Sequence, residues 1–230
     1  MQLWFSAWLE QPQGHVILTA WVIWIIVSIT LHELSHGWAA VRLGDTTPID
    51  TGHMTLNPVV HMGVPSLVMF ALTGMAWGAM PVDPTRLRGR HGDAWVSFAG
   101  PAMNIALAIG CILAAALWET LARPSSSNSA IGAQTYENIR MFFRIGAFLN
   151  IALFCFNMLP APPLDGSRIL ASFCRPYREI LTRDVGRFLG AVVFVLAFIF
   201  ASELVAGVGG AITRAGIAAV KQVFHLLGAP

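Results

Sequence analysis

Four long stretches without a charged residue constrain this chain most strongly. No Asp, Glu, Lys or Arg occurs in residues 11–32, 51–82, 94–118 or 145–164. About 20 apolar helical residues cross the hydrocarbon core of a bilayer, so each stretch is long enough to span a membrane. Charged residues make up 11% of the chain, against roughly 25% in a typical soluble domain. These stretches predict a polytopic membrane protein and exclude a typical water-soluble globule.

The rest of the chain predicts one all-α membrane domain over residues 1–230, because no polar block of domain size remains. We expect about four full transmembrane helices, the last over about residues 188–206. Apolar residues recur after the glycines at 207–210 on one helical face, which predicts a C-terminal amphipathic helix on the membrane surface. The formal net charge is only +2 and the basic residues are scattered, so nothing indicates nucleic acid binding.

One motif inside the first apolar stretch indicates chemistry: residues 32–36 read His-Glu-Leu-Ser-His. Helical residues four apart share a face, so His32 and His36 can bind one metal while Glu33 reaches a water beside it. A charge in the middle of a membrane helix costs roughly 2.5–3.5 kcal/mol, which favours a functional role for Glu33. The alternative is that the three side chains only satisfy one another in a packed bundle.

A third metal ligand must come from elsewhere in the chain, because a catalytic zinc usually has three protein ligands and one open position. The extended pattern HExxHxxGxxH would need Gly and His where Ala39 and Arg42 stand. A glutamate ligand on a following helix is also excluded, since no Glu lies between Glu33 and Glu119. The two soluble arrangements of an HExxH zinc site are therefore ruled out.

Asp165 is the best candidate for the third ligand. It follows the proline-rich residues 160–163, which prevent a regular helix, and an unwound segment buried in protein can hold a polar ligand at membrane depth. Alternatively, Asp165 caps a helix that begins near Ser167. Asn157 lies eight residues earlier, and its amide is a candidate oxyanion donor. A structural hydrogen bond is an equally good interpretation of Asn157.

Three segments together resemble the site-2 protease family of intramembrane zinc metalloproteases. They are the His-Glu-Leu-Ser-His motif, Gly-Pro-Ala-Met-Asn at residues 100–104, and Asn-Met-Leu-Pro-Ala-Pro-Pro-Leu-Asp-Gly at residues 157–166. The resemblance covers about residues 24–173 and is closest to minimal members without PDZ-like or CBS-like domains. One departure is visible: residues 61–63 read His-Met-Gly where minimal members often have His-x-Asp.

The resemblance implies one zinc ion per chain with three ligands: His32, His36 and Asp165. It implies Glu33 as general base, Asn157 as oxyanion donor and Asn104 as a polar packing residue near the site. It also implies a zinc core of about residues 15–174 in a multi-pass protein of a prokaryotic cell membrane. The implied activity is hydrolysis of peptide bonds within transmembrane segments of other membrane proteins, as in regulated intramembrane proteolysis.

The topology depends on residues 64–80, which are apolar but contain Pro65, Gly74 and Gly78. We expect a re-entrant or interfacial hairpin here, with short β-strands near residues 53–56. A full crossing would place the histidine motif and Asp165 at opposite faces of the membrane. Re-entry places both on the face that carries nine of the fourteen basic residues, which positive-inside counting assigns to the cytosol.

Two other functions remain open at this point: a catalytically silent zinc-binding membrane protein and a metal transporter. A transporter predicts further ionisable residues within the spans, but outside the motif only Glu203 is a clear case. We expect packing or surface roles for the remaining histidines: His15, His53, His61, His91 and His225. Apart from the bilayer and a transmembrane substrate, association with a second copy of the chain is left open.

Overall fold

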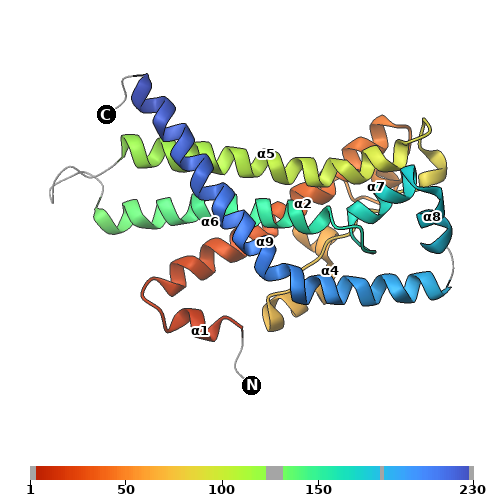
Figure 1. The fold of residues 1–230 in the computed structure, drawn as a ribbon, viewed down its shortest axis with the longest axis horizontal. Helices are drawn as coiled ribbons and strands as arrows, with labels where there is room; N and C mark the ends of the chain where they lie inside the picture. The colour runs from red at the N-terminus through yellow and green to blue at the C-terminus, as the bar shows by residue number, and fades with distance from the viewer. Residues whose placement is uncertain (1–3, 123–131, 182–183, 228–230) are drawn as a thin grey trace.

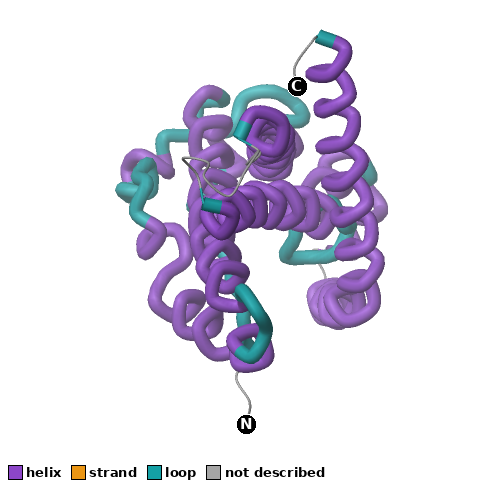
Figure 2. The backbone as a smooth tube through the Cα atoms, turned by 90° about the vertical axis from the view of Figure 1, so that its left-hand side faces the viewer, coloured by secondary structure: helices purple, strands orange, loops and turns teal. Residues whose placement is uncertain are grey.

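The computed structural model describes residues 4–122, 132–181 and 184–227, and within these ranges no β-strand occurs (Figure 2). The regular elements are α1 (Ser6–Leu9), α2 (Gly14–Arg42), α3 (Thr47–Asp50), α4 (Pro58–Thr73), the 3-10 helix η1 (Pro84–Arg86), α5 (Gly92–Leu121), α6 (Ala133–Asn157), α7 (Asp165–Phe173), α8 (Arg175–Leu181) and α9 (Asp184–Leu226). The strands expected near residues 53–56 are wrong. The backbone there turns on itself instead, with His53 N–H donating to Pro48 C=O and Thr55 N–H to His53 C=O.

Four helical segments are long and apolar enough to cross a membrane, which confirms a multi-pass, all-α protein. They are Gly14–Arg42, Gly92–Leu121, Ala133–Asn157 and Glu203–Leu226. Helix α5 is central, because it contacts α2, α6, α7 and α9 (Figure 1).

The packing is that of a membrane protein, with small residues between the helices and large apolar residues outside. Small side chains let the helix backbones approach closely, which drives association in lipid. Almost fully buried small residues occur in each of the three central helices: Ala20, Ala40, Ala108, Ala115, Ala116 and Ala147. Large apolar side chains are exposed on two of these helices, α2 and α5: Ile23, Trp38, Ile109, Leu113 and Leu117. An outer surface of this kind is typical of helices that lie in a membrane.

The region from α4 to residue 80 does not form one continuous span. Asn57 caps α4 by accepting a hydrogen bond from Val59 N–H, and the helix is kinked at Gly63, where φ is +67° and ψ is 161°. After Thr73 the chain turns back in an extended conformation along α4. Ser66 Oγ donates to Trp77 C=O at 2.7 Å, and Ala79 N–H donates to His61 C=O at 2.9 Å. A kinked helix with a returning segment therefore takes the place of the expected re-entrant or interfacial hairpin with short β-strands.

The C-terminal region also differs from expectation. The apolar face expected on the membrane surface belongs to α9, which the structure describes as one helix from Asp184 to Leu226. Ile217 is buried in a cluster with Ala115 and Ala116 of α5, and Phe224 packs against the same cluster. The physical reason is that the two alanines leave room on α5 for this face. Within the described residues the candidate span is Glu203–Leu226, and the span expected over about residues 188–206, several of whose side chains lie outside the described part, stays a prediction.

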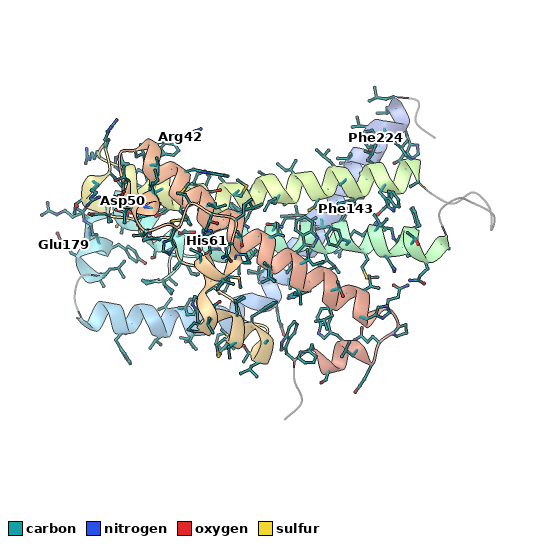
Figure 3. All side chains as sticks on the ribbon, turned by 180° about the vertical axis from the view of Figure 1, so that it is seen from behind. Arg42, Asp50, His61, Phe143, Glu179 and Phe224 are labelled. Atoms are coloured by element: carbon teal, nitrogen blue, oxygen red, sulfur yellow. The ribbon has the colours of Figure 1, made fainter. Side chains whose placement is uncertain are left out.

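The long helices bring distant parts of the sequence to one end of the bundle. Figure 3 shows Arg42 at the end of α2, Asp50 of α3 and Glu179 of α8 at one end, with Phe143 and Phe224 at the other. Helix α7 lies at the first end and packs against α5 (Figure 1). This arrangement places the start of α7 beside the histidine motif of α2.

Candidate metal centre

Three buried side chains converge where α2 meets the start of α7. The Nε2 atoms of His32 and His36 are 3.0 Å apart, and Asp165 Oδ2 lies 3.1 Å from the first and 3.4 Å from the second. Donors bound to one tetrahedral zinc at about 2.0–2.2 Å lie about 3.3–3.6 Å from one another. His32, His36 and Asp165 are thus close enough together to hold one metal ion, and no second such group of His, Cys, Asp or Glu occurs among the described residues.

The two histidines meet because they are four residues apart on α2, where side chains lie one turn above each other. Asp165 reaches them because the irregular residues 158–164 end directly at the first turn of α7. Gly166 makes this approach possible, because a Cβ atom there would clash with the backbone carbonyl of Met158. The glycine after the aspartate is thus required by packing.

The other edge of each imidazole is held by a hydrogen bond to a defined acceptor. His36 Nδ1 lies 2.7 Å from Val96 C=O, which can only accept, so Nδ1 carries the proton. His32 Nδ1 lies 2.7 Å from Asn104 Oδ1, at one end of a chain of hydrogen bonds. Asn104 Nδ2 donates to Asn150 Oδ1 at 3.0 Å, and Asn150 Nδ2 donates to Gly146 C=O at 2.9 Å.

The direction of that chain fixes the tautomer of His32. A backbone carbonyl accepts only, so each asparagine must present its amide oxygen toward His32, and His32 Nδ1 must donate. Both Nε2 atoms are then lone-pair donors that face each other and the carboxylate of Asp165. Three electron-rich atoms within 3.4 Å repel one another unless a cation lies between them. The residues present therefore fit a divalent metal such as zinc.

Asp165 supplies the negative charge of the donor set. Its Oδ2 atom lies 3.1 and 3.4 Å from the two imidazole nitrogens, and a carboxylate binds a metal in its ionised form.

Glu33 lies beside the centre on α2 and is buried, with 7% of its surface exposed. In the described part of the chain, no hydrogen bond or ion pair holds its carboxylate. The extended segment after α4 covers it: a Cβ atom at Gly78 would lie 2.6 Å from Glu33 Oε1. A buried carboxylate without a protein partner is free to act on a water or a substrate.

The backbone of α5 closes the other side of the centre. A Cβ atom at Gly100 would lie 2.5 Å from Nε2 of both His32 and His36. Only glycine fits this position, because a methyl group would occupy the space beside both Nε2 atoms.

The structure places the other sequence candidates as follows. Asn104 lies next to His32, as the family resemblance implied. Asn157 ends α6, and its Nδ2 donates to Leu153 C=O at 3.0 Å, as in the structural interpretation. The oxyanion role of Asn157 stays a prediction. His61 and His91 have packing contacts, with Thr55 C=O and with the ring of Phe173 respectively.

Sequence reasoning missed two residues of the site, Asn150 and Gly78. Asn150 is fully buried within an otherwise apolar stretch, and this isolated amide was a usable signal, since polar residues inside a membrane helix need a partner. Gly78 gave no comparable signal, because its contact with Glu33 depends on how the chain returns along α4.

Comparison with known proteins agrees with this geometry. The sequence model of peptidase family M50 matches residues 20–200. The chain is 35% identical over 183 residues to "Putative zinc metalloprotease YwhC" of Bacillus subtilis, which covers 77% of this chain and 79% of that protein. It is 30% identical over 210 residues to "Putative zinc metalloprotease Rip2" of Mycobacterium tuberculosis, covering 87% and 74%. No solved structure matches the chain.

Proposed function

The chain belongs to peptidase family M50, the site-2 protease family, and we propose that it is a zinc metalloprotease that hydrolyses peptide bonds within transmembrane segments of other proteins. The observation that carries the proposal is the convergence of His32, His36 and Asp165 beside the unpartnered carboxylate of Glu33. Family membership favours this activity over a silent zinc-binding protein or a metal transporter.

One zinc ion per chain would be held by Nε2 of His32, Nε2 of His36 and a carboxylate oxygen of Asp165. Bound there, zinc supplies a Lewis acid that lowers the pKa of water to about 7 and polarises a scissile carbonyl. Glu33 takes a proton from the attacking water as the new C–O bond forms. It then delivers that proton to the leaving nitrogen as the C–N bond breaks, giving a carboxylate and an amine.

Asn157 is proposed as the donor that stabilises the developing oxyanion, in agreement with the family resemblance. Its amide is half-buried and now bonds to its own helix. Exchange of that bond for one to a substrate carbonyl would supply stabilisation at the stage where negative charge develops.

The extended segment at residues 75–83 is a suitable surface for an unwound substrate. Ser66 and His61 of α4 hold the backbone of Trp77 and Ala79. Within the described chain, the backbone groups of Gly78 and Met80 have no hydrogen-bond partner. Gly78 lies against Glu33. An extended substrate backbone paired here would lie next to the general base.

We also propose that the metal end of the bundle faces the cytosol of a prokaryotic cell. Several arginines of the more basic face lie at this end and contact the loops that connect its helices. Arg86 pairs with Asp50 and Asp83, Arg88 N–H donates to Leu43 C=O, and Arg168 pairs with Asp93. An excess of arginine on one face favours the cytosolic side.

The test is a cleavage assay on a substrate embedded in the membrane, with zinc measured per chain. Wild type and Glu33→Gln are purified in parallel, and each is assayed in the same lipid vesicles. We expect one zinc in both proteins and loss of cleavage in the variant alone. Equal cleavage by both proteins would rule out Glu33 as general base. Asp165→Asn should instead lose zinc while the fold is retained.

A further inference from the structure

A second polar site lies at the end of the bundle opposite the metal centre. A cavity of about 530 Å³ opens there between α5, α6 and α9. Phe143 and Phe224 mark that end in Figure 3. Each directly precedes a lining residue in the sequence, Arg144 and His225 respectively. Three of the lining residues are cationic, from two different helices: Arg144, Arg214 and Lys221.

One carboxylate anchors two of these cations. Glu119 has only 5% of its side chain exposed, and its Oε1 accepts from Arg144 Nε at 2.7 Å and Nη2 at 2.6 Å. Lys221 Nζ lies 3.2 Å from Oε2 of the same residue. Both cations keep about a third of their side chains exposed to the cavity, so N–H donors remain for another acceptor.

Arg214 is the third cation and has no acidic partner in the described part of the chain. It lies on Glu203–Leu226, a segment apolar enough to span a membrane. An unpaired cation on such a segment is costly unless it meets an anion or reaches the interface. With three cations against Glu119, the side chains of the cavity carry a formal excess of two positive charges.

The surroundings of the cavity are apolar on the side of α9. Ile217 lines the cavity and is 2% exposed, and Val208, Ile212 and Val223 of the same helix are exposed. A ligand that joins an anionic group to hydrocarbon would satisfy both parts of this surface. Gln222 adds an amide donor at the rim.

We propose that this cavity binds the phosphate group of an anionic phospholipid, with the acyl chains along the outer face of α9. Basic pockets between membrane helices take such headgroups because the phosphate oxygens accept several N–H donors at once. Arg214 would supply the charge that no carboxylate of the protein neutralises. The site is independent of the metal centre and of the proposed proteolysis.

The test compares lipids that differ only in the headgroup. Delipidated full-length protein in detergent is titrated with phosphatidylglycerol or phosphatidylcholine with identical acyl chains, and bound lipid is counted by native mass spectrometry. We expect tighter binding of phosphatidylglycerol, reduced about fivefold in Arg214→Gln, since one basic residue near an anionic lipid contributes about that factor. Arg214→Lys should retain the preference.

The matched control is Arg178→Gln, which removes an exposed arginine of α8 at the metal end. It should leave the preference unchanged. Equal binding of both lipids by wild type, or an equal loss in both glutamine variants, would overturn the proposal. Inorganic phosphate at the same concentration should fail to displace the lipid. Displacement by phosphate would overturn the lipid as occupant and assign the cavity to a free anion.

Discussion

A hydrogen bond of 2.7 Å joins Nδ1 of His32 to Oδ1 of Asn104, across the interface between α2 and α5. The bond fixes which nitrogen of the imidazole faces Asp165. Behind this bond, Asn104 donates to Asn150, and Asn150 donates to the backbone carbonyl of Gly146. Because that carbonyl can only accept, His32 must be the donor to Asn104. The orientation of His32 in the candidate metal centre therefore depends on an amide relay that reaches α6.

Removal of this relay should weaken metal binding without unfolding the protein. In Asn104→Ala, we expect the zinc affinity to fall 10- to 100-fold, because His32 loses the acceptor that orients its ring. Competition with a chelator of known affinity measures the change. Asn138→Ala is the matched control, since the hydrogen bond that Asn138 makes within the described residues is to Gln134, on an exposed part of α6. Unchanged affinity in Asn104→Ala would contradict the relay.

Gly100→Ala should abolish zinc binding. The added Cβ would lie 2.5 Å from both ligand nitrogens, and the rigid backbone of α5 cannot yield easily. Gly110→Ala is a control on the same helix, because a Cβ there meets nothing within 4 Å. Zinc per chain and the melting temperature should be measured for both. A full zinc content in Gly100→Ala would contradict the prediction, because it would mean that α5 does not lie this close to the two histidines when zinc is bound.

Gly78→Ala should separate zinc binding from catalysis. Its Cβ would lie 2.6 Å from Glu33 Oε1, and the three atoms nearest to it belong to Glu33 and Ile29. We expect zinc to be retained and cleavage to fall about 100-fold, since a displacement of about 1 Å at a catalytic group costs that factor. Cleavage at the wild-type rate would mean that the segment moves away from Glu33 before the reaction.

Asn157→Ala tests the two interpretations of this amide. An oxyanion donor predicts a fall in kcat of about 10²- to 10³-fold with unchanged zinc content and little change in KM. A purely structural bond to Leu153 predicts a lower melting temperature with kcat preserved in the folded protein. Single-turnover cleavage beside thermal unfolding distinguishes the two.

The loop after α2 should lose stability in acid through Asp45. Burial alone would raise the pKa of this carboxyl, but hydrogen bonds from Thr47 and from Asp83 N–H hold the pKa below its ordinary value of 3.8. The stabilisation is present above the ordinary value and is lost as the pH falls through the lowered pKa. Asp45→Asn should lower the melting temperature by a few degrees at pH 7 and remove part of the acid dependence. Asp50→Asn, on an exposed site, should change neither.

Much of the site was predictable because its first half lies on one helix. The pairing of His32 with His36 follows from the helical repeat, and the uncharged stretches indicated where membrane helices run. The α4 region was mispredicted because prolines and glycines allow several irregular paths. A kinked helix formed there instead of strands, and the returning segment is held to it by hydrogen bonds at Trp77 and Ala79. The C-terminal helix was mispredicted for a different reason. An apolar face such as that of Ile217 can lie on a membrane surface or pack against another helix, and the sequence pattern is the same in both cases. In the structure it packs against Ala115 and Ala116.

The sequence by itself determined a membrane-embedded helical protein with two histidines and a glutamate on one helix, since neighbours along a helix are set by its geometry. It also favoured Asp165 as the third ligand. Only the tertiary structure decided that Asp165 meets those histidines and that Gly100 and Gly78 enclose the centre. It likewise decided that Asn150 supports the centre from α6. These contacts join residues far apart in the chain, and they depend on how closely small side chains let α2, α5 and α6 pack.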